Sequence, residues 1–263
     1  SADAIMTRIE DTGSKLVITS DGAFRGGGLV PLKFNVDMAL SEGSRVKKVI
    51  VVRRTGIPVE MIEDRDLWWS EAISSADSRC DFEPLGSDHP LFTLHTSGFT
   101  SPPRGICHST AGYLLHCALS FKWMFESRED DIHWCTGDIG WITGHSYAVY
   151  GPLCAGATTL IYEGSPTYPR HDRYLEIIDK FGVNSFYTTP TIIRALMKEG
   201  SEQADRWNLS SLRALGCVGE AIDAEALAWY GEVIGGGRCH VVNSWWQTET
   251  GGSCLATFPC CER

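Results

Sequence analysis

The sequence lacks several features that would assign a protein to a common class at once. Its 263 residues contain no apolar run of about 18 residues, the length that a membrane-spanning helix needs. The N-terminal stretch SADAIMTRIEDTG does not show the basic-then-apolar order of a signal peptide. The formal net charge of -10 is spread along the chain without a long block of one sign. We therefore expect a cytoplasmic protein, with the nucleus or an organelle left open, that has no membrane partner and no nucleic-acid partner.

The ten cysteines also lack a metal-binding or disulfide pattern, because they form no CxxC pair and show no regular spacing. Most lie in apolar segments, where a thiol packs as a small hydrophobic group. The nearest approach to a metal cluster is Cys107, His108, His116 and Cys117. A helix over residues 111–124 would turn His116 and Cys117 to different faces. We predict reduced, packed cysteines and no zinc site.

What the sequence does contain is an alternation of apolar strands and amphipathic helices, clearest from about residue 88 onward. This alternation predicts parallel strands joined by crossover helices. Strands are expected at 91–95, 131–135, 158–164, 183–188, 211–219 and 239–246, and helices at 111–125, 145–154, 173–182, 191–200 and 223–235. Residues 1–87 have shorter helix and strand segments of their own. The predicted fold is α/β, with doubly wound, mostly parallel sheets and flanking helices in two subregions, 1–87 and 88–263.

Four loops that follow predicted strands are rich in glycine, threonine, serine and tryptophan. They read HTSGFTSPPRG, TGDIGWITGHS, GCVGEAID and NSWWQTETGG. Ligands of open α/β sheets bind at the carboxyl ends of the strands, and hydroxyls with approachable backbone N–H groups suit a polyphosphate. One such loop alone would be read as an ordinary turn, but four in succession favour a binding site. The spacing GxxxxGK[ST] is absent, which excludes the common nucleotide-triphosphatase loop.

The first loop, TSGFTSPPRG, resembles the phosphate loop of adenylate-forming enzymes, whose usual form is TSGSTGKPKG. DIHWCTGDIGWITGHSYAVYGPLCAGATTLIYEGSPTYP and VVNSWWQTETGG resemble the AMP-forming acetyl-CoA synthetases more narrowly, and the resemblance extends from residue 1 to about residue 257. It implies the central part of the large N-terminal domain, and it implies that the small C-terminal domain with its catalytic lysine is absent. The implied reaction joins acetate and ATP, with Mg²⁺, into acetyl-adenylate and pyrophosphate, and then transfers the acetyl group to coenzyme A.

The resemblance also implies roles for individual residues. For ATP and AMP, the matching positions are Thr96, Ser97, Gly98 and Thr100 at the phosphates, Gly219, Glu220 and Ala221 along the adenine, and Asn243, Ser244, Trp245, Gln247 and Thr248 around the nucleotide. Glu249 matches the magnesium-binding glutamate, and Thr248 and Glu249 form the implied catalytic pair. Trp246 would close an acetate pocket whose other walls are Ile142, Thr143 and Val218. Arg25, Thr143 and Thr167 match positions that face coenzyme A.

The phosphate loop departs from the family pattern at Phe99, Ser101, Pro102 and Arg104. Phe99 removes a hydroxyl donor, and Pro102 removes both a cation and a backbone N–H, so we expect weaker ATP binding. Gly28, Ala221 and Asn243 are smaller departures. Three hypotheses stay open: a synthetase whose chain is inactive by itself, a catalytically dead adenine-nucleotide-binding or regulatory module, and a non-functional remnant. Open sheet edges would also promote self-association.

Overall fold

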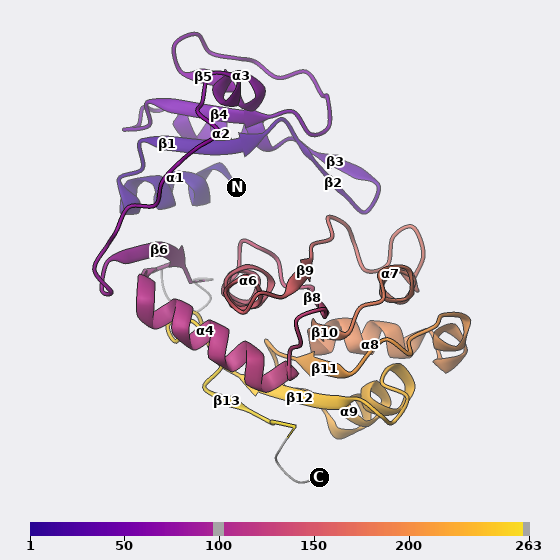
Figure 1. Ribbon diagram of the computed structural model, residues 1–263. Coiled ribbons are helices and arrows are strands. Elements are labelled where there is room, and N and C mark those ends of the chain that lie inside the picture. The colour runs from indigo at the N-terminus through magenta and orange to yellow at the C-terminus, as the bar shows by residue number, and fades with distance from the viewer. Residues whose placement is uncertain (97–102, 260–263) are drawn as a thin grey trace. The chain divides into compact units, whose positions relative to one another are not determined.

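The computed structural model describes residues 1–96 and 103–259, which form two compact units (Figure 1). Residues 1–86 belong to the N-terminal unit, and residues 87–96 together with those from 106 onward belong to the C-terminal unit. Each unit has a parallel sheet and its own buried apolar core. The α/β class expected from the sequence is confirmed. No helix of the described residues combines the length and the apolarity needed to cross a membrane.

The N-terminal unit is built on a three-stranded parallel sheet with the strand order β1-β4-β5. Its strands and helices are β1 (Leu16–Ser20), β4 (Lys48–Val52), β5 (Asp66–Trp68), α1 (Ala2–Thr12), α2 (Leu32–Leu40) and α3 (Trp69–Ser74). Alternate residues of β4, Val49 and Val51, are fully buried and pack with Ile9 of α1 and Val36 and Leu40 of α2. The helices therefore cover the sheet with the apolar faces that their sequences provide.

A short hairpin, not foreseen from the sequence, follows β1. Its strands are β2 (Ala23–Arg25) and β3 (Gly28–Val30), which pair antiparallel with Arg25 opposite Gly28. The two residues between them, Gly26 and Gly27, have φ of 55° and 83°, the positive values that a tight two-residue hairpin turn requires. Arg25, a predicted coenzyme A contact, is therefore placed at the tip of a hairpin.

A buried carboxylate holds the base of this hairpin against the end of β4. Asp21 is completely buried, and its Oδ1 accepts hydrogen bonds from the backbone N–H groups of Gly22 (2.7 Å), Arg54 (2.8 Å) and Thr55 (2.9 Å). Its Oδ2 accepts a further bond from the N–H of Gly56, at 2.6 Å. One side chain thus joins the two chain segments that leave the carboxyl ends of β1 and β4.

A cluster of ionic side chains joins α2 to the start of β5 in the same unit. The ammonium group of Lys33 is fully buried and lies 2.7 Å from Asp37 and 2.8 Å from Asp66. Arg65 contacts the same two carboxylates. Because every buried charge has a partner of opposite sign, the cluster avoids the desolvation penalty of an isolated charge.

The C-terminal unit contains a six-stranded sheet with the order β13-β12-β11-β10-β8-β9. The strands are β8 (Ile132–Cys135), β9 (Thr158–Leu160), β10 (Ser185–Thr188), β11 (Ala214–Cys217), β12 (His240–Trp245) and β13 (Leu255–Ala256). The first five are mutually parallel, and β13 pairs antiparallel with β12. A separate pair, β6 (Pro90–His95) and β7 (Gly105–Ser109), precedes the sheet, and β7 was not expected from the sequence.

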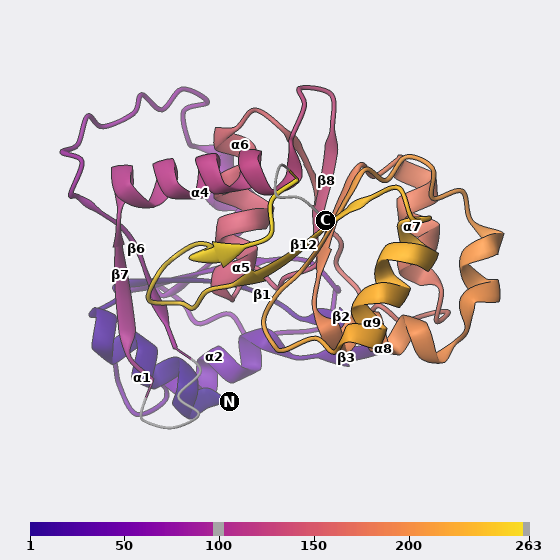
Figure 2. The ribbon, with the colours of Figure 1, turned by 90° about the horizontal axis from the view of Figure 1, so that it is seen from below.

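Helices cover both faces of this sheet (Figures 1 and 2). One face carries α4 (Thr110–Phe125) and a continuous helical segment made of α5 (Ile142–Gly144), a π-helical turn at His145–Tyr150 and α6 (Gly151–Cys154). The other carries α7 (Arg173–Phe181), α8 (Pro190–Lys198), a 3₁₀ helix at Ser201–Arg206, and α9 (Ala224–Trp229) with the π-helical turn Tyr230–Ile234.

The side chains of the central strands alternate between these two cores. Trp134 and Phe186 pack on the α7 to α9 face, whereas the next residues, Cys135 and Tyr187, pack on the α4 face. Strands buried on both faces read as nearly continuous apolar runs, which is why the sequence located them well. The doubly wound arrangement is confirmed for this unit.

Candidate functional site

The strand order of the C-terminal unit creates a point where the winding of the sheet reverses. After β8 the chain adds β9 on one side, and it then crosses back to add β10, β11 and β12 on the other side. At such a point the loops that leave two neighbouring strands diverge and open a crevice, which is the usual ligand site of doubly wound sheets. The carboxyl ends of β8 and β10 are therefore the place where the topology predicts a site.

A pocket of about 380 Å³ lies at these strand ends. The loops after β8, β10 and β11 supply its walls, which consist of Thr136, Gly137, Asp138, Trp141, Thr143, Tyr187, Thr188, Thr189, Thr191, Val218, Gly219 and Glu220. Four residues predicted from the sequence, Thr143, Val218, Gly219 and Glu220, are brought together here. The many threonines offer hydroxyl groups that donate and accept hydrogen bonds, as a sugar or phosphate requires.

The loop after β8 is held closely to its neighbours. Thr136 donates its backbone N–H to Tyr187 O at 2.9 Å, and its hydroxyl lies 2.7 Å from that of Thr188. The turn that follows is closed by Asp138, whose Oδ1 accepts the N–H of Gly140 at 2.7 Å. A Cβ at Gly144 would overlap the Asp138 carbonyl group, so only glycine lets the helix start this close to the loop. The wall that carries exposed Trp141 is thereby fixed in place.

The loop after β11 is anchored through Glu220. Its Oε1 accepts the Thr191 N–H at 2.6 Å together with the Thr191 hydroxyl, and Arg194 lies 3.8 Å from its Oε2. Arg194 also donates to Ala221 O at 3.0 Å, so two of the predicted adenine-contact residues are tied to the start of α8. Gly219 has φ of 102°, a value that side chains other than hydrogen strongly disfavour.

The remaining predicted acyl-pocket residues lie behind the pocket and do not form its surface. Trp246 is buried, packs edge to face on Tyr147 with ring centres 5.2 Å apart, and donates its Nε1–H to the Tyr187 hydroxyl at 3.3 Å. Ile142 belongs to the same apolar cluster as Trp246, and so does Val218, which also lines the pocket. Tyr187 thus stands between the indole of Trp246 and the pocket that Tyr187 itself lines.

Three hydrogen bonds, made by the side chains of His108, Ser146 and Tyr147, hold the stretch around Thr248 and Glu249 in place. His108 of β7 hydrogen-bonds through Nε2 to Thr248 O at 2.8 Å, and burial lowers the pKa of His108, so the neutral ring acts as the donor. Ser146 donates to Gly251 O, and the Tyr147 hydroxyl accepts the Ser253 N–H at 2.8 Å. The Glu249 carboxylate is exposed and makes no hydrogen bond or ion pair within the described part of the chain. A carboxylate of this kind is a suitable Mg²⁺ ligand.

The other predicted nucleotide residues line up along β12 and its loop. Ser244 is buried and donates to Cys217 O at 3.1 Å, whereas its neighbours Asn243 and Trp245 are exposed. Gln247 is exposed and donates its backbone N–H to the Thr250 hydroxyl at 3.1 Å. The exposed side chains are accessible to a ligand, and the buried one fixes the strand end.

Several predicted residues lie away from these strand ends or outside the description. Arg25 is in the N-terminal unit, and Thr167 lies in the loop before α7, where its N–H donates to Ser165 Oγ at 3.4 Å. Thr96 is the last described residue before the gap at residues 97–102, so Ser97, Gly98 and Thr100 lie outside the described residues.

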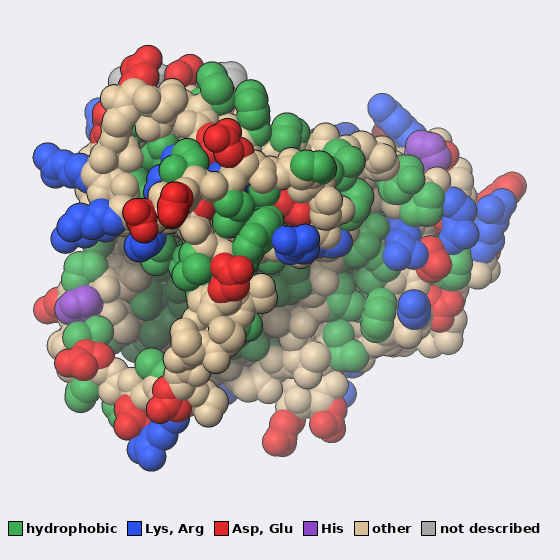
Figure 3. Space-filling view, turned by 90° about the horizontal axis from the view of Figure 1, so that it is seen from above, with side chains coloured by type: hydrophobic (Ala, Val, Ile, Leu, Met, Phe, Trp, Pro, Cys, Tyr) green, Lys and Arg blue, Asp and Glu red, His purple; other side chains and the backbone are tan. Residues whose placement is uncertain are grey.

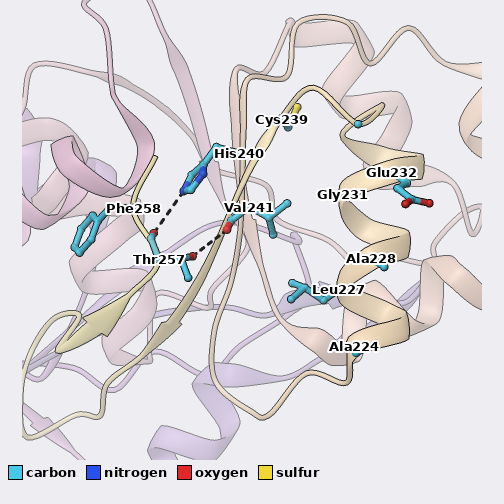
Figure 4. Close-up of a pocket in the computed structure, with 11 residues that line it drawn as sticks. Ala224, Leu227, Ala228, Gly231, Glu232, Cys239, His240, Val241, Thr257 and Phe258 are labelled. Atoms are coloured by element: carbon cyan, nitrogen blue, oxygen red, sulfur yellow. Dashed lines mark hydrogen bonds between the residues drawn. The ribbon is translucent and has the colours of Figure 1, made fainter. Parts of the chain in front are cut away.

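A larger hollow of about 540 Å³ lies elsewhere, between α9 and β12 (Figure 4). Leu227, Ala228 and Val241 give it mainly apolar walls, and Thr257 joins its rim to β12 by donating its hydroxyl to Val241 O at 3.0 Å. It is away from the carboxyl ends of β8 and β10 and lacks the threonine-rich walls of the smaller pocket. Size therefore does not identify the site here, whereas topology and chemistry do.

Sequence reasoning missed Tyr187, His108 and the threonines of the loop after β10. The run YTTP lies at the carboxyl end of a predicted strand, where the four recognised loops also begin. Its hydroxyl groups could have indicated a fifth ligand-binding loop. Nothing in the sequence could have paired His108 with Thr248, because 140 residues separate them.

Over the face shown in Figure 3, acidic and basic side chains are interspersed.

Comparisons with known proteins agree with the geometry. The whole chain, residues 1–263, matches the family described as AMP-binding enzyme. It is 51% identical over 259 residues to the acetyl-coenzyme A synthetase of Rubrobacter xylanophilus, covering 98% of this chain and 40% of that protein. Identity is 51% to the Rhodopirellula baltica synthetase and 50% to that of Photobacterium profundum, again over 98% of this chain and 39% and 40% of theirs. The chain thus spans about 40% of the length of these relatives, and it belongs to the AMP-binding enzyme family.

Proposed function

We propose that this chain supplies the nucleotide- and acyl-binding part of an AMP-forming acetate–CoA ligase. The observation that carries the proposal is the threonine-rich pocket at the point where the sheet reverses, walled by Gly219, Glu220, Thr143 and Val218. Similarity to proteins named acetyl-coenzyme A synthetase supports acetate, ATP and coenzyme A as the proposed substrates. A cytoplasmic location remains part of this proposal.

In the first step proposed, a carboxylate oxygen of acetate attacks the α-phosphorus of ATP, and pyrophosphate leaves. The chain's part is to hold the two reactants in line and to stabilise the crowded phosphate oxygens. Gly219, Glu220 and Ala221 would flank the adenine, and the 243–248 stretch would enclose the rest of the nucleotide. Thr96, Ser97, Gly98 and Thr100 would contact the phosphates. Bound Mg²⁺ would neutralise phosphate charge, and Glu249 would hold it.

In the second step, the thiol of coenzyme A attacks the acyl carbon, and AMP leaves. Arg25, Thr143 and Thr167 are the proposed contacts for coenzyme A. An arginine suits the phosphates of its nucleotide part, since a guanidinium donates two parallel hydrogen bonds to phosphate oxygens. Thr143 would face both the acyl group and the thiol, because it lines the pocket together with residues of the loops after β8, β10 and β11.

Exchange of radiolabelled pyrophosphate into ATP tests the proposal. In the experiment, this chain replaces its matched 259-residue segment in the Rubrobacter xylanophilus synthetase. We expect acetate-dependent exchange, raised further by the double change Phe99→Ser and Pro102→Lys, which returns a hydroxyl and a cation to the phosphate loop. A folded chimaera without exchange in both forms would contradict the proposal. AMP binding without exchange would instead favour a nucleotide-binding module that has lost catalysis.

We also propose that two copies of the chain associate through β13. This strand ends the strand order, and its Leu255 is 68% exposed. Beside it, a hollow of about 460 Å³ is lined by Leu115 and Trp123 of α4 and by Phe258. Among the described residues, β13 pairs on one side alone, with β12. Because a free strand edge is a template for another strand, a second β13 can pair with it around a two-fold axis.

The change Leu255→Lys is expected to weaken this association by at least tenfold, since it places a charge at the centre of the paired edge. Light scattering coupled to size-exclusion chromatography measures the mass. Leu153→Lys, at an exposed side chain of α6, is the matched control and should leave the mass unchanged. A wild-type chain that is monomeric at 100 µM, on the order of a weak dimer's dissociation constant, would refute the proposed dimer.

A further inference from the structure

Trp246 is buried, and its indole N–H has one hydrogen-bond partner among the residues that the structure describes. The indole Nε1–H donates to the Tyr187 hydroxyl at 3.3 Å. Tyr187 is fully buried, and its hydroxyl lies 2.6 Å from Ser244 Oγ, which in turn donates to Cys217 O at 3.1 Å.

The donors and acceptors of this chain leave one consistent order. Ser244 has one hydroxyl proton and gives it to the Cys217 carbonyl, so Tyr187 must be the donor to Ser244. The lone pairs of the Tyr187 oxygen are then available to the indole N–H. Burial raises the pKa of Tyr187 well above its usual value, so this hydroxyl keeps its proton. The bonds therefore run from Trp246 through Tyr187 and Ser244 to the end of β11.

Aromatic packing restricts the same two rings. Tyr147 meets Trp246 edge to face with centroids 5.2 Å apart and an interplanar angle of 81°. It also meets Tyr187 at 5.6 Å and 89°. Tyr187 is one of the residues that line the pocket, whereas Trp246 is not among them. These contacts hold the two rings against each other, and the hydroxyl of Tyr187 fixes their mutual position.

We propose that Tyr187 is a specificity-determining positioning residue, which locks Trp246 through the bonds to Ser244 and Cys217 O and thereby excludes acyl chains longer than acetyl. This inference rests on the proposed function. A ring that is free to rotate away would enlarge the pocket, and about one methylene of added space is worth roughly tenfold or more in discrimination. The change Tyr187→Phe removes the hydroxyl and keeps the ring. It therefore tests the positioning of Trp246 while leaving the volume of the side chain at position 187 nearly unchanged.

The test measures binding of two stable acyl-adenylate mimics, the acetyl and butanoyl sulfamates of adenosine, to the 263-residue chain by calorimetry. The wild-type chain should prefer the acetyl mimic, and Tyr187→Phe should reduce that preference about tenfold, chiefly by tighter binding of the butanoyl mimic. Tyr230→Phe is the matched control, since Tyr230 is also fully buried and donates to Phe186 O at 3.1 Å on the opposite face of the sheet. The Tyr230→Phe chain should prefer the acetyl mimic over the butanoyl mimic to the same extent as the wild type.

Hydrogen exchange of the Trp246 indole N–H, assigned with Trp246→Phe, tests the anchor without any ligand. We expect at least tenfold faster exchange in Tyr187→Phe and no change in Tyr230→Phe. An unchanged exchange rate, or an unchanged acetyl preference in a chain that binds both mimics, would overturn the inference and leave the proposed function standing. A folded wild-type chain that binds neither mimic would overturn both.

Discussion

Replacing Asp21 with asparagine is expected to lower the free energy of unfolding of the N-terminal unit by about 1–3 kcal/mol at pH 7. The asparagine amide nitrogen cannot accept the hydrogen bonds that the second carboxylate oxygen accepts. The N–H of Gly56, now 2.6 Å from Oδ2, would face another donor. The attachment of the Arg25 hairpin to the end of β4 would be weakened, and with it the support of the proposed coenzyme A contact.

The effect should depend on pH in a defined direction. Burial raises the pKa of Asp21, but the N–H groups of Thr55, Arg54, Gly22 and Gly56 outweigh it and lower the pKa from 3.8 to about 2. A depressed carboxyl pKa stabilises the fold above the unfolded pKa, and this contribution disappears as the pH falls from about 4 to about 2. The difference between wild type and variant should therefore shrink over that interval.

Native-state hydrogen exchange of β1 and β4 amides measures this difference, because these amides report on the N-terminal unit alone. Asp77→Asn is the control, since the exposed Asp77 accepts one backbone N–H, that of Arg79 at 2.9 Å. That change should cost less than about 0.5 kcal/mol. An Asp21→Asn chain that is as stable as the wild type at pH 7 would show that the carboxylate is not the anchor described here.

Valine at position 219 is expected to weaken AMP binding by at least about 30-fold, or roughly 2 kcal/mol. A Cβ at Gly219 would meet only Thr189, at 3.9 Å, so a larger side chain would extend into the open pocket and occupy the space proposed for adenine. The φ of 102° would also strain the valine backbone.

Gly200→Val separates the two effects. Gly200 has φ of 87°, and no atom lies within 4 Å of the place that a Cβ would take, so the backbone strain is similar but the position is exposed and outside the pocket. We expect a comparable loss of thermal stability in both variants and a loss of AMP affinity in Gly219→Val alone. Equal AMP affinity in the two variants would place the nucleotide elsewhere.

The apolar strands of the C-terminal unit could be predicted because both of their faces are buried, which leaves continuous runs such as VNSFYT. The β2–β3 hairpin could not, since three-residue strands on either side of Gly26 and Gly27 carry no periodic signal. β7 was missed for a similar reason, because Ile106 and Cys107 are the only apolar side chains in its sequence GICHS.

The two adjacent tryptophans show which features of the site could be predicted from the sequence and which could not. Their spacing in NSWWQTETGG indicated a site, and alternation along a strand end explains why Trp245 is exposed and Trp246 buried. The partner that fixes Trp246, Tyr187, lies 59 positions away and could only be identified from the fold. The residue types of the site could thus be predicted from the sequence, whereas the contacts that orient their side chains depend on the order of the strands in the sheet.

Calorimetric titration of the 263-residue chain with AMP, and then with ATP and Mg²⁺, tests most directly whether the pocket at the ends of β8, β10 and β11 binds an adenine nucleotide. We predict saturable binding at one site, with affinity for ATP reduced by the changed phosphate loop relative to that of the Phe99→Ser and Pro102→Lys chain. A demonstrably folded chain that shows no saturable heat with either nucleotide would contradict the account.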